Sequence, residues 1–380
     1  MKAENNLHPS KLCDIHFTAG ISIIVPTYRE VENIPLLLQR IDQVRKDNGL
    51  TLEVLFMDDK SDDGSVEAVA AAGFEWARII VRDKDRGLSP AVIDGFRAAR
   101  YPVLVCMDCD LSHPATTIPK LVLALNSGQQ FVIGSRYVPG GSTDDDWGFF
   151  RWFNSLVATV LARPLTTVRD PMSGFFALRK SDFDAAQGLN PVGYKVALEL
   201  IVKCGFENVG EVPIRFADRQ YGKSKLTLVE QLKYIKHLRR LYMHQFASMM
   251  YFAQFLVVGA SGVIVNLAVL SLAFWAGLPE WFCLAGGIAV SLVSNFLLNR
   301  RFTFSYARHD PVLRQFLGFV SASLLGLIVN YSVAMGLRMT MFAEGTFALQ
   351  LSALAGIAAG MGFNFMGARY LVFRKRFVRR

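Results

Sequence analysis

Four long segments without a charged side chain or a histidine constrain this chain more than any other feature. They cover residues 245–279, 281–299, 315–337 and 345–368. An α-helix needs about 20 apolar residues to cross a bilayer, and each segment is long enough. The apolar runs before residue 240 are short and resemble strands. The sequence therefore predicts a soluble first half followed by four transmembrane helices.

The charges of the second half predict its orientation. Residues 241–380 contain 11 Lys and Arg but only three acidic residues, within a total formal charge of +9. The basic residues gather in the 300–314 loop and after Arg369, and the opposite loops have almost none. By the positive-inside rule, the soluble half, this loop and both termini lie in the cytoplasm. The basic character thus indicates a membrane lipid surface as partner and no nucleic acid.

The first half alternates between strand-like and helix-like segments after a polar leader, residues 1–20. This alternation predicts an open parallel sheet with helices on both faces. The predicted strands are 21–26, 53–58, 77–82 and 103–108, and the predicted helices are 34–45, 66–72 and 89–99.

Polar clusters follow three of the predicted strands, at 26–30, 58–65 and 106–114. Ligands of such sheets bind beyond the carboxyl ends of the strands. If the fourth strand continues through Asp108, that residue and Asp110 project to the same side, because alternate strand residues share a face. Two neighbouring carboxylates repel unless a cation lies between them. The pattern predicts a divalent-cation site that binds an anionic ligand.

The five cysteines are odd in number and scattered, which favours a reducing compartment. Cys106 and Cys109 have C-x-x-C spacing, but there is no second pair that would indicate a zinc or redox site.

Two segments have the composition of amphipathic helices. Residues 147–165 are rich in aromatic side chains, and residues 228–246 combine Leu232, Ile235 and Leu238 with several Lys and Arg. Such helices lie at a membrane surface. Packing against the edge of the sheet is the alternative interpretation.

The membrane half repeats itself. The segment 255–266 matches 319–330, including a shared Gly and a terminal Asn, and Asn295-Phe296 is echoed by Asn364-Phe365. Two helical hairpins of the same orientation follow from this repeat. Close packing and interhelical hydrogen bonds explain the small residues and the Asn residues. Passage of a lipid or sugar is the other interpretation of the Asn set.

Six motifs in order resemble glycosyltransferase family 2, and are similar in particular to the polyprenol- and dolichol-phosphate mannose synthases. They are P-T-Y-R-E, D-D-K-S-D-D-G-S, D-C-D-L-S-H-P, G-S-R-Y, D-P-M-S-G-F and R-Q-Y-G-K-S-K-L, within residues 20–228. The second half resembles the GtrA-like four-helix membrane domain. The resemblance implies a GT-A catalytic domain at 21–228, an interface helix at 229–246, a membrane domain at 247–373 and a basic tail at 374–380.

The resemblance also implies roles for individual residues. The expected nucleotide-binding residues are Pro26, Tyr28, Glu30, Met57, Asp59 and the backbone at Cys109. The expected metal ligands are Asp108, Asp110 and, less directly, Ser112. The expected phosphate-binding residues are Arg136 and Arg151 for the acceptor and Lys195, Arg219 and Lys225 for the sugar nucleotide, with Asp110, Arg136 and Arg151 as the catalytic set.

The reaction implied is an inverting transfer of mannose from GDP-mannose to a polyprenyl (dolichyl) phosphate, with Mg²⁺ or Mn²⁺. A phosphate acceptor is mostly a dianion at neutral pH and needs no general base, so we expect Asp170 to orient its neighbours. A UDP-glucose-dependent glucosyltransferase and a lipid-linked sugar flippase stay open as alternatives. A processive polysaccharide synthase is disfavoured, because Gly148-Phe-Phe-Arg-Trp152 lacks the Gln of the Q-x-x-R-W motif.

Overall fold

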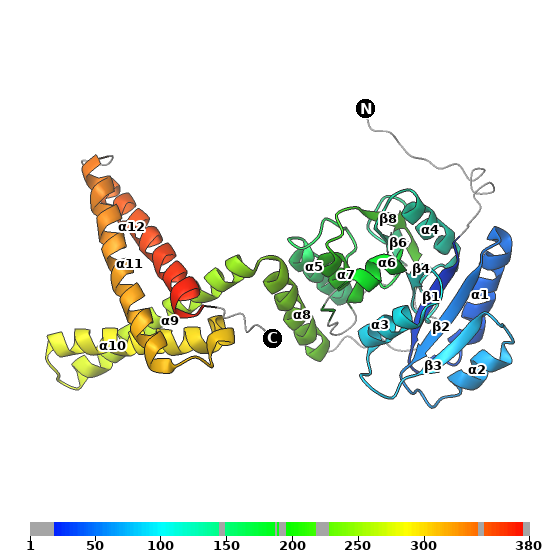
Figure 1. The fold of residues 1–380 in the computed structure, drawn as a ribbon, viewed down its shortest axis with the longest axis horizontal. Helices are drawn as coiled ribbons and strands as arrows, with labels where there is room; N and C mark the ends of the chain where they lie inside the picture. The colour runs from blue at the N-terminus through cyan, green and yellow to red at the C-terminus, as the bar shows by residue number, and fades with distance from the viewer. Residues whose placement is uncertain are drawn as a thin grey trace. The chain divides into compact units, whose positions relative to one another are not determined.

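The computed structural model describes residues 19–143, 149–186, 188–189, 195–217, 228–340 and 346–374, with only the helical backbone at 149–155, 228–230 and 346–349. It divides into two units, Met1–Gln245 and Phe246–Arg380, which are described separately (Figure 1).

Seven strands in the described part of the first unit form one mixed sheet in the order β3-β2-β1-β4-β7-β5-β8. They are β1 (Ile21–Thr27), β2 (Leu52–Asp58), β3 (Ala77–Val81), β4 (Val103–Cys106), β5 (Phe131–Ser135), β7 (Phe176–Arg179) and β8 (Val209–Pro213). β1 is central: Ile21 pairs with Leu52 on one side and with Val103 on the other, both in parallel register. Two short strands, β6 (Ser142–Thr143) and β9 (Arg215–Phe216), pair separately.

The prediction of an all-parallel sheet is wrong at β7, which runs antiparallel between β4 and β5. The chain reaches β7 through a loop at the carboxyl edge of the sheet. The amide of Gly134 in β5 donates to the Phe175 carbonyl, and the amide of Arg136 donates to Asp170. A strand that starts at this edge must run back through the sheet, because a parallel strand would need a crossover to the opposite edge. The same loop brings Asp170 to the edge where the acidic clusters lie.

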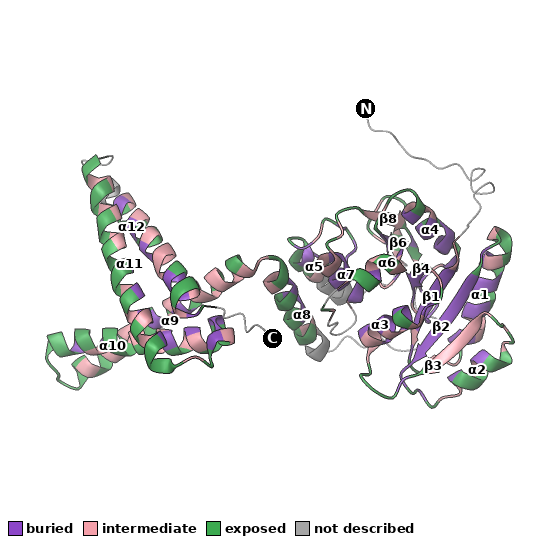
Figure 2. Cartoon of the chain, in the orientation of Figure 1, coloured by how far each residue is buried: buried purple, intermediate pink, exposed green. Residues whose placement is uncertain are grey.

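Helices cover both faces of the sheet, as predicted, because successive strand residues point to opposite sides. Ile23 and Val25 pack in the core under one face, and Ile24 packs in the core under the other. The first face is covered by α1 (Asn33–Asn48), α2 (Ser65–Ala71) and α4 (Ile118–Asn126), and the second by α3 (Leu88–Ala98), α6 (Lys180–Ala185) and α7 (Val196–Cys204). Figure 2 shows β1, β2 and the inner sides of these helices as buried.

The two segments expected to be amphipathic form α5 (Phe149–Ala162) and α8 (Leu228–Gln245). They lie against each other: the Tyr234 hydroxyl donates to the Ala158 carbonyl at 2.7 Å. Leu238 is buried in the catalytic unit, so its assignment to the membrane-facing side is wrong, whereas Leu232 and Ile235 are exposed. α8 therefore packs on the catalytic unit with one side, and membrane contact by its outer side stays a prediction.

Four helices among the described residues of the second unit are long and apolar enough to cross a membrane, as the sequence predicts. They are α9 (Ala247–Trp275), α10 (Glu280–Leu298), α11 (Val312–Thr340) and α12 (Thr346–Met366). α10 and α12 each continue into a short π-helix, at Asn299–Thr303 and Gly367–Val372. Aromatic residues near these ends, with Phe304 and Phe373 stacked at 4.9 Å, form a core.

The internal repeat appears in the structure as matched pairs of Asn and Gly within each hairpin. A Cβ atom built on the glycine would contact the asparagine side chain in the pairs Gly262–Asn295 and Gly287–Asn266 of the first hairpin, and Gly326–Asn364 and Gly356–Asn330 of the second. Close helix packing is thus confirmed. The Oδ1 atoms of Asn266, Asn295 and Asn364 are buried without a hydrogen-bond partner in the described structure, so the expected interhelical bond is not formed at these oxygens.

Replacement of Gly360 by Ala should destabilise the second hairpin. Its Cβ would lie 2.6 Å from the Gly326 carbonyl oxygen and 2.8 Å from Asn330 Cβ, so the helices would have to separate. We expect a cost of about 1–3 kcal/mol, seen as a lower midpoint of thermal unfolding in detergent. Gly362→Ala in the same helix is the control, because a Cβ there meets nothing within 4 Å. Equal midpoints for the two variants would contradict the close-packing interpretation.

Candidate functional site

The two acids of the D-x-D motif lie in a loop and not on a strand, because β4 ends at Cys106. The argument that alternate strand residues share a face is therefore wrong for this pair. The backbone turns at Leu111, which has φ of 64°. Asp110 is buried, and its Oδ1 accepts hydrogen bonds from the Ser112 hydroxyl at 2.6 Å and the Ser112 amide at 3.2 Å. A local turn thus holds the Asp110 carboxylate in place.

Acids from three loops still meet at one place, around Cys109. Burial raises the pKa of the Cys109 thiol well above its ordinary value, and the carboxylates of Glu30, Asp110, Asp108 and Asp63 raise it further. These residues follow β1, β2 and β4 in the chain. The predicted convergence of acidic clusters at the carboxyl edge is therefore present in the structure.

Asp108 stands against a glycine of the loop that leads to β7. A Cβ at Gly174 would lie 3.3 Å from Asp108 Oδ1, so any other residue there would require the Asp108 carboxylate to shift by a few tenths of an ångström. The Asp108 amide donates to His113 Nδ1 at 3.0 Å. The His113 ring stacks on Phe175 with 5.1 Å between ring centroids, and burial lowers its pKa, so it is neutral at pH 7. His113 was not assigned a role from the sequence and acts here as a support for Asp108.

A basic group lies beside the acids. Arg136 Nε and Nη2 donate to the two oxygens of Asp170 at 2.7 and 2.8 Å, and Asp170 is fully buried. Burial lowers the pKa of Lys195 to about 7, and the charge of Arg136 acts in the same direction, while Asp170 and Asp108 oppose it. Lys195 and Arg136 thus share one partly desolvated site with Asp108.

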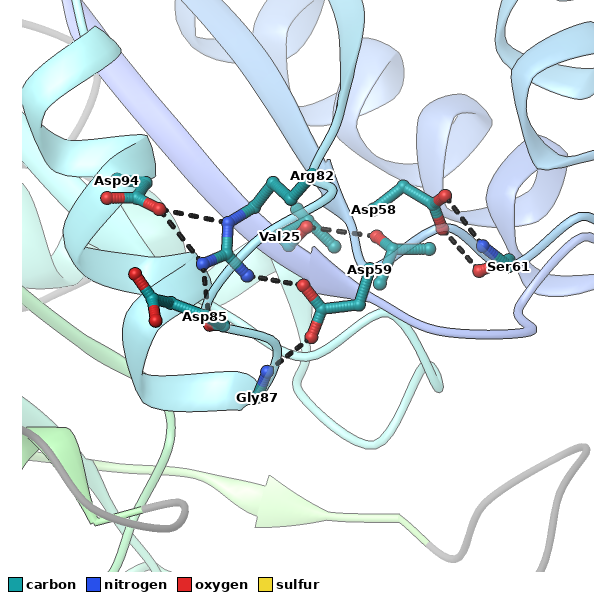
Figure 3. A network of polar contacts seen from close by, with 9 residues as sticks. Val25, Asp58, Asp59, Ser61, Arg82, Asp85, Gly87 and Asp94 are labelled. Carbon is teal, nitrogen blue, oxygen red and sulfur yellow. Dashed lines mark hydrogen bonds and ion pairs between the residues drawn. The ribbon is translucent and has the colours of Figure 1, made fainter.

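Asp59 is the centre of a second network, at the end of β2 (Figure 3). Its carboxylate forms a buried ion pair with Arg82 and accepts a hydrogen bond from the Gly87 amide at 2.6 Å. Arg82 also contacts Asp94 at 2.9 Å and donates to the Asp85 carbonyl at 3.0 Å. Both oxygens of Asp59 are engaged, so its expected contact with a nucleoside stays a prediction. Arg82 was missed because no local pattern distinguishes it from other arginines.

The remaining predicted residues differ in their positions. Tyr28 is exposed at the edge next to β1, with Arg29 over its ring, and the Glu30 carboxylate accepts from the Asn33 side chain at 2.6 Å. Pro26 is part of β1, and the Met57 side chain is buried in the core beside α3. Arg219 and Lys225 lie outside the described residues, and Arg151 lies on α5 where only the backbone is described.

The donor chemistry of the acidic group fits a divalent cation. Asp108 keeps 28% of its side chain exposed, and Ser112 holds the Asp110 carboxylate through its Oδ1 atom. Mg²⁺ is usually held by one or two carboxylates, with substrate phosphates and water as the other ligands. Within the described ranges, no three His, Cys, Asp or Glu residues form a metal-binding group, so the metal ligands stay a prediction. Ser112 donates to Asp110, and its role as a ligand stays a prediction.

Comparisons with known proteins identify the two units. Residues 22–186 match the glycosyl transferase family 2 description, and residues 254–376 match the GtrA/DPMS transmembrane domain. A dolichol-phosphate mannosyltransferase of Pyrococcus furiosus is 37% identical over 318 residues, which cover 82% of this chain and 89% of that protein. The chain therefore belongs to the dolichol-phosphate mannosyltransferase family. It is a glycosyltransferase and an integral membrane protein.

Two further relatives support the same assignment. The dolichol-phosphate mannosyltransferase of Mycosarcoma maydis is 42% identical, over 68% of this chain and 88% of that protein. The enzyme of that name from Saccharomyces cerevisiae is 42% identical, over 60% of this chain and 88% of that protein. Among solved structures, glucosyl-3-phosphoglycerate synthase of Mycobacterium tuberculosis with Mn²⁺, UDP and glucosyl-3-phosphoglycerate is 20% identical with a TM-score of 0.48, and the match covers 64% of this chain and 86% of that one.

Replacement of Asp59 by Asn should destabilise the catalytic unit by about 3–5 kcal/mol, because it leaves the buried Arg82 guanidinium without its closest counter-charge. Asp94→Asn is the control: its side chain is 43% exposed, so its loss should cost less than about 1 kcal/mol. Urea unfolding of both variants, followed by circular dichroism, measures the difference. Similar free energies of unfolding would show that the Asp59–Arg82 pair does not stabilise the fold.

Proposed function

We propose that this enzyme transfers mannose from GDP-mannose to a polyprenyl (dolichyl) phosphate, with inversion at the anomeric carbon and with Mg²⁺ or Mn²⁺ bound. The observation that carries the proposal is the juxtaposition of the acidic motif with Arg136 at one edge of the sheet. His113, whose Nδ1 accepts from the Asp108 amide, and the Arg136 guanidinium both contact the ring of Phe216, at 5.5 and 5.2 Å. The lowered pKa of Lys195, which Arg136 and Asp108 both influence, is consistent with this arrangement. The diphosphate of the donor and the phosphate of the acceptor both take part in such a reaction, and this edge would bind both. The names of the relatives support the sugar and the acceptor.

The acidic side would receive the donor. Asp108 and Asp110 would hold the cation, which when bound neutralises charge on the departing nucleoside diphosphate. Ser112 keeps the Asp110 carboxylate in one orientation through two hydrogen bonds. Because both acids are held by local contacts, little reorganisation is required when the donor binds.

On the basic side, Arg136 would bind the acceptor and Lys195 would face the phosphates of the donor. Asp170 holds Arg136 in one orientation by a bidentate pair, and a planar guanidinium suits phosphate recognition. A phosphate monoester is mostly a dianion at neutral pH, since its second pKa is about 6. Its oxygen can attack the anomeric carbon as the bond to the nucleotide breaks, and GDP leaves with the bonding electrons. No general base is required, and a single displacement inverts the configuration.

The membrane unit would bring the enzyme to its lipid acceptor. Both termini and the catalytic unit would lie in the cytoplasm, because the positive-inside rule favours this side for the basic residues of the 300–314 loop and the tail. This is the side on which a nucleotide sugar is available.

The direct test is a transfer assay with the purified full-length protein in lipid nanodiscs. It uses radiolabelled GDP-mannose or UDP-glucose, a polyprenyl phosphate, and either Mg²⁺ or EDTA. We expect labelled lipid from GDP-mannose with the metal and none with EDTA. If labelled lipid forms only from UDP-glucose, the transferred sugar is glucose and not mannose. If neither donor gives labelled lipid, the result favours a transport function.

Two variants in the same assay separate the acid that would hold the cation from the acid that orients Arg136. Asp110→Asn should lower kcat by a factor on the order of 10²–10³, because it removes charge that stabilises the departing nucleotide. Asp170→Asn should lower kcat less, because the Asn side chain can still accept one of the Arg136 bonds. If both variants are equally inactive, Asp170 does more than orient its neighbour.

Donor affinity should depend on pH through Lys195. Its pKa is about 7 without ligand, and a bound polyphosphate raises this pKa because an anion stabilises the ammonium form. The affinity for GDP-mannose is therefore highest below pH 7, where Lys195 is already protonated. Between pH 7 and the pKa of Lys195 in the bound state, the association constant falls by roughly tenfold per pH unit. Calorimetric titration of GDP-mannose between about pH 6 and pH 9 measures this slope. Lys195→Arg should flatten the profile, and an unchanged slope would exclude Lys195 as its origin.

A further inference from the structure

One arginine at the end of the fourth candidate span has no hydrogen-bond acceptor in the described structure. Arg369 lies in the π-helix Gly367–Val372, inside the span Gln350–Val372. Its guanidinium carbon is 4.9 Å from the ring centroid of Tyr251, 5.8 Å from that of Phe365 and 5.3 Å from that of Tyr370. Its Nη1 atom is buried, and no described residue accepts a hydrogen bond from it.

The internal repeat supplies a matched arginine for comparison. The pattern Asn-Phe-x₃-Arg-x₃-Phe occurs at 295–304 and again at 364–373, so Arg369 corresponds to Arg300. Arg300 Nε donates to Gln315 Oε1 at 2.8 Å, and its Nη2 donates to the carbonyls of Arg308 and Asp310. In the first hairpin, therefore, the chain itself provides acceptors for the guanidinium. They come from the loop and the helix that follow Arg300 in the chain.

An arginine within a span is costly unless an acceptor or anion compensates it. The rings around Arg369 contribute cation–π attraction, about 0.5–2 kcal/mol for a favourable contact, but their faces accept no strong hydrogen bond. A guanidinium with a free N–H edge matches the oxygens of a phosphate group in a bidentate arrangement. The missing acceptor in the second hairpin is thus of the type that a phosphate supplies.

The position of Arg369 indicates where this phosphate comes from. Tyr251 is near the start of α9, where the chain enters the membrane unit from the catalytic unit, and Tyr251 stacks with Phe304 at 5.9 Å. The site therefore lies at the end of the helix bundle where α9 begins. Lipid headgroups are found at such helix ends, and aromatic and basic side chains gather there.

We propose that Arg369, together with the rings of Tyr251, Phe365 and Tyr370, binds the phosphate group of a membrane lipid. All of these residues belong to the membrane unit, and none of them is among the residues assigned above to sugar transfer. Either a polyprenyl phosphate or an ordinary anionic phospholipid carries the required phosphate, and the experiment distinguishes the two.

Native mass spectrometry of the full-length protein tests the site. The protein is released from detergent micelles that contain polyprenyl phosphate, phosphatidylglycerol or zwitterionic phosphatidylcholine, and the retained lipids are counted. Arg369→Gln should lower the retention of at least one of the two anionic lipids by about tenfold, as expected for loss of roughly 1.4 kcal/mol of binding. Arg369→Lys should retain an intermediate amount, because the charge stays but the bidentate contact is lost.

Arg301→Gln is the matched control. Arg301 is exposed at the same end of the bundle, contacts the Phe302 ring, and is not part of the aromatic group around Arg369. Its replacement removes the same charge and should change lipid retention less than twofold. If the Arg369→Gln variant retains less polyprenyl phosphate but as much phosphatidylglycerol as the wild type, the isoprenoid lipid is the ligand. If it retains less of both anionic lipids, the site binds lipid phosphates in general. The proposal is overturned if the Arg369→Gln and Arg301→Gln variants retain equal amounts of the anionic lipids. It is also overturned if Arg369→Gln lowers the retention of phosphatidylcholine as much as that of the anionic lipids.

If Arg369→Gln does not fold, the wild-type protein decides the question by photolabelling. A phosphate lipid with a diazirine in its headgroup should label residues 367–372 or the start of α9, and unlabelled anionic lipid but not phosphatidylcholine should compete. Labelling elsewhere overturns the proposal. Mannose transfer by Arg369→Lys should persist with a short, water-soluble acceptor phosphate, so failure of the lipid site and failure of the proposed function give different results.

Discussion

The catalytic edge depends on one buried ion pair, between Arg136 after β5 and Asp170 in the loop before β7. Asp170 is fully buried, and it also accepts from the Arg136 amide. The pair joins two segments 34 residues apart and fixes where β7 enters the sheet. Gly174 in the same loop permits the close approach of Asp108. Removal of this pair would therefore affect the acidic group and the basic group of the site together.

The membrane unit shows how a repeat can diverge while its packing is retained. Matched Asn and Gly residues bring the two helices of each hairpin together, and both hairpins end in a π-helix with an arginine at the same position. Arg300 has acceptors from the chain that follows it, whereas Arg369 is surrounded by rings. The same position of the repeat thus has different surroundings in the two hairpins.

Much of the architecture could be predicted because it depends on local patterns. The strand and helix segments before residue 110 follow from hydrophobic periodicity, and the spans follow from the absence of charge, so β1 and α9 were found close to their observed bounds. The antiparallel β7 could not be found this way, because strand direction depends on which edge the chain enters from. The Asp59–Arg82 pair was missed for a similar reason, since its partners are 23 residues apart and share no motif.

The residue pattern alone was enough to establish two units, the family, four spans and the acidic clusters at one edge of a sheet. Each of these depends on composition or on order along the chain. The folded structure was needed to show that Asp108 and Asp110 lie in a loop, that one side of α8 is buried and that Arg369 has no acceptor among the described residues. These features depend on which distant side chains come within a few ångströms of each other, and this information is absent from any short stretch of sequence.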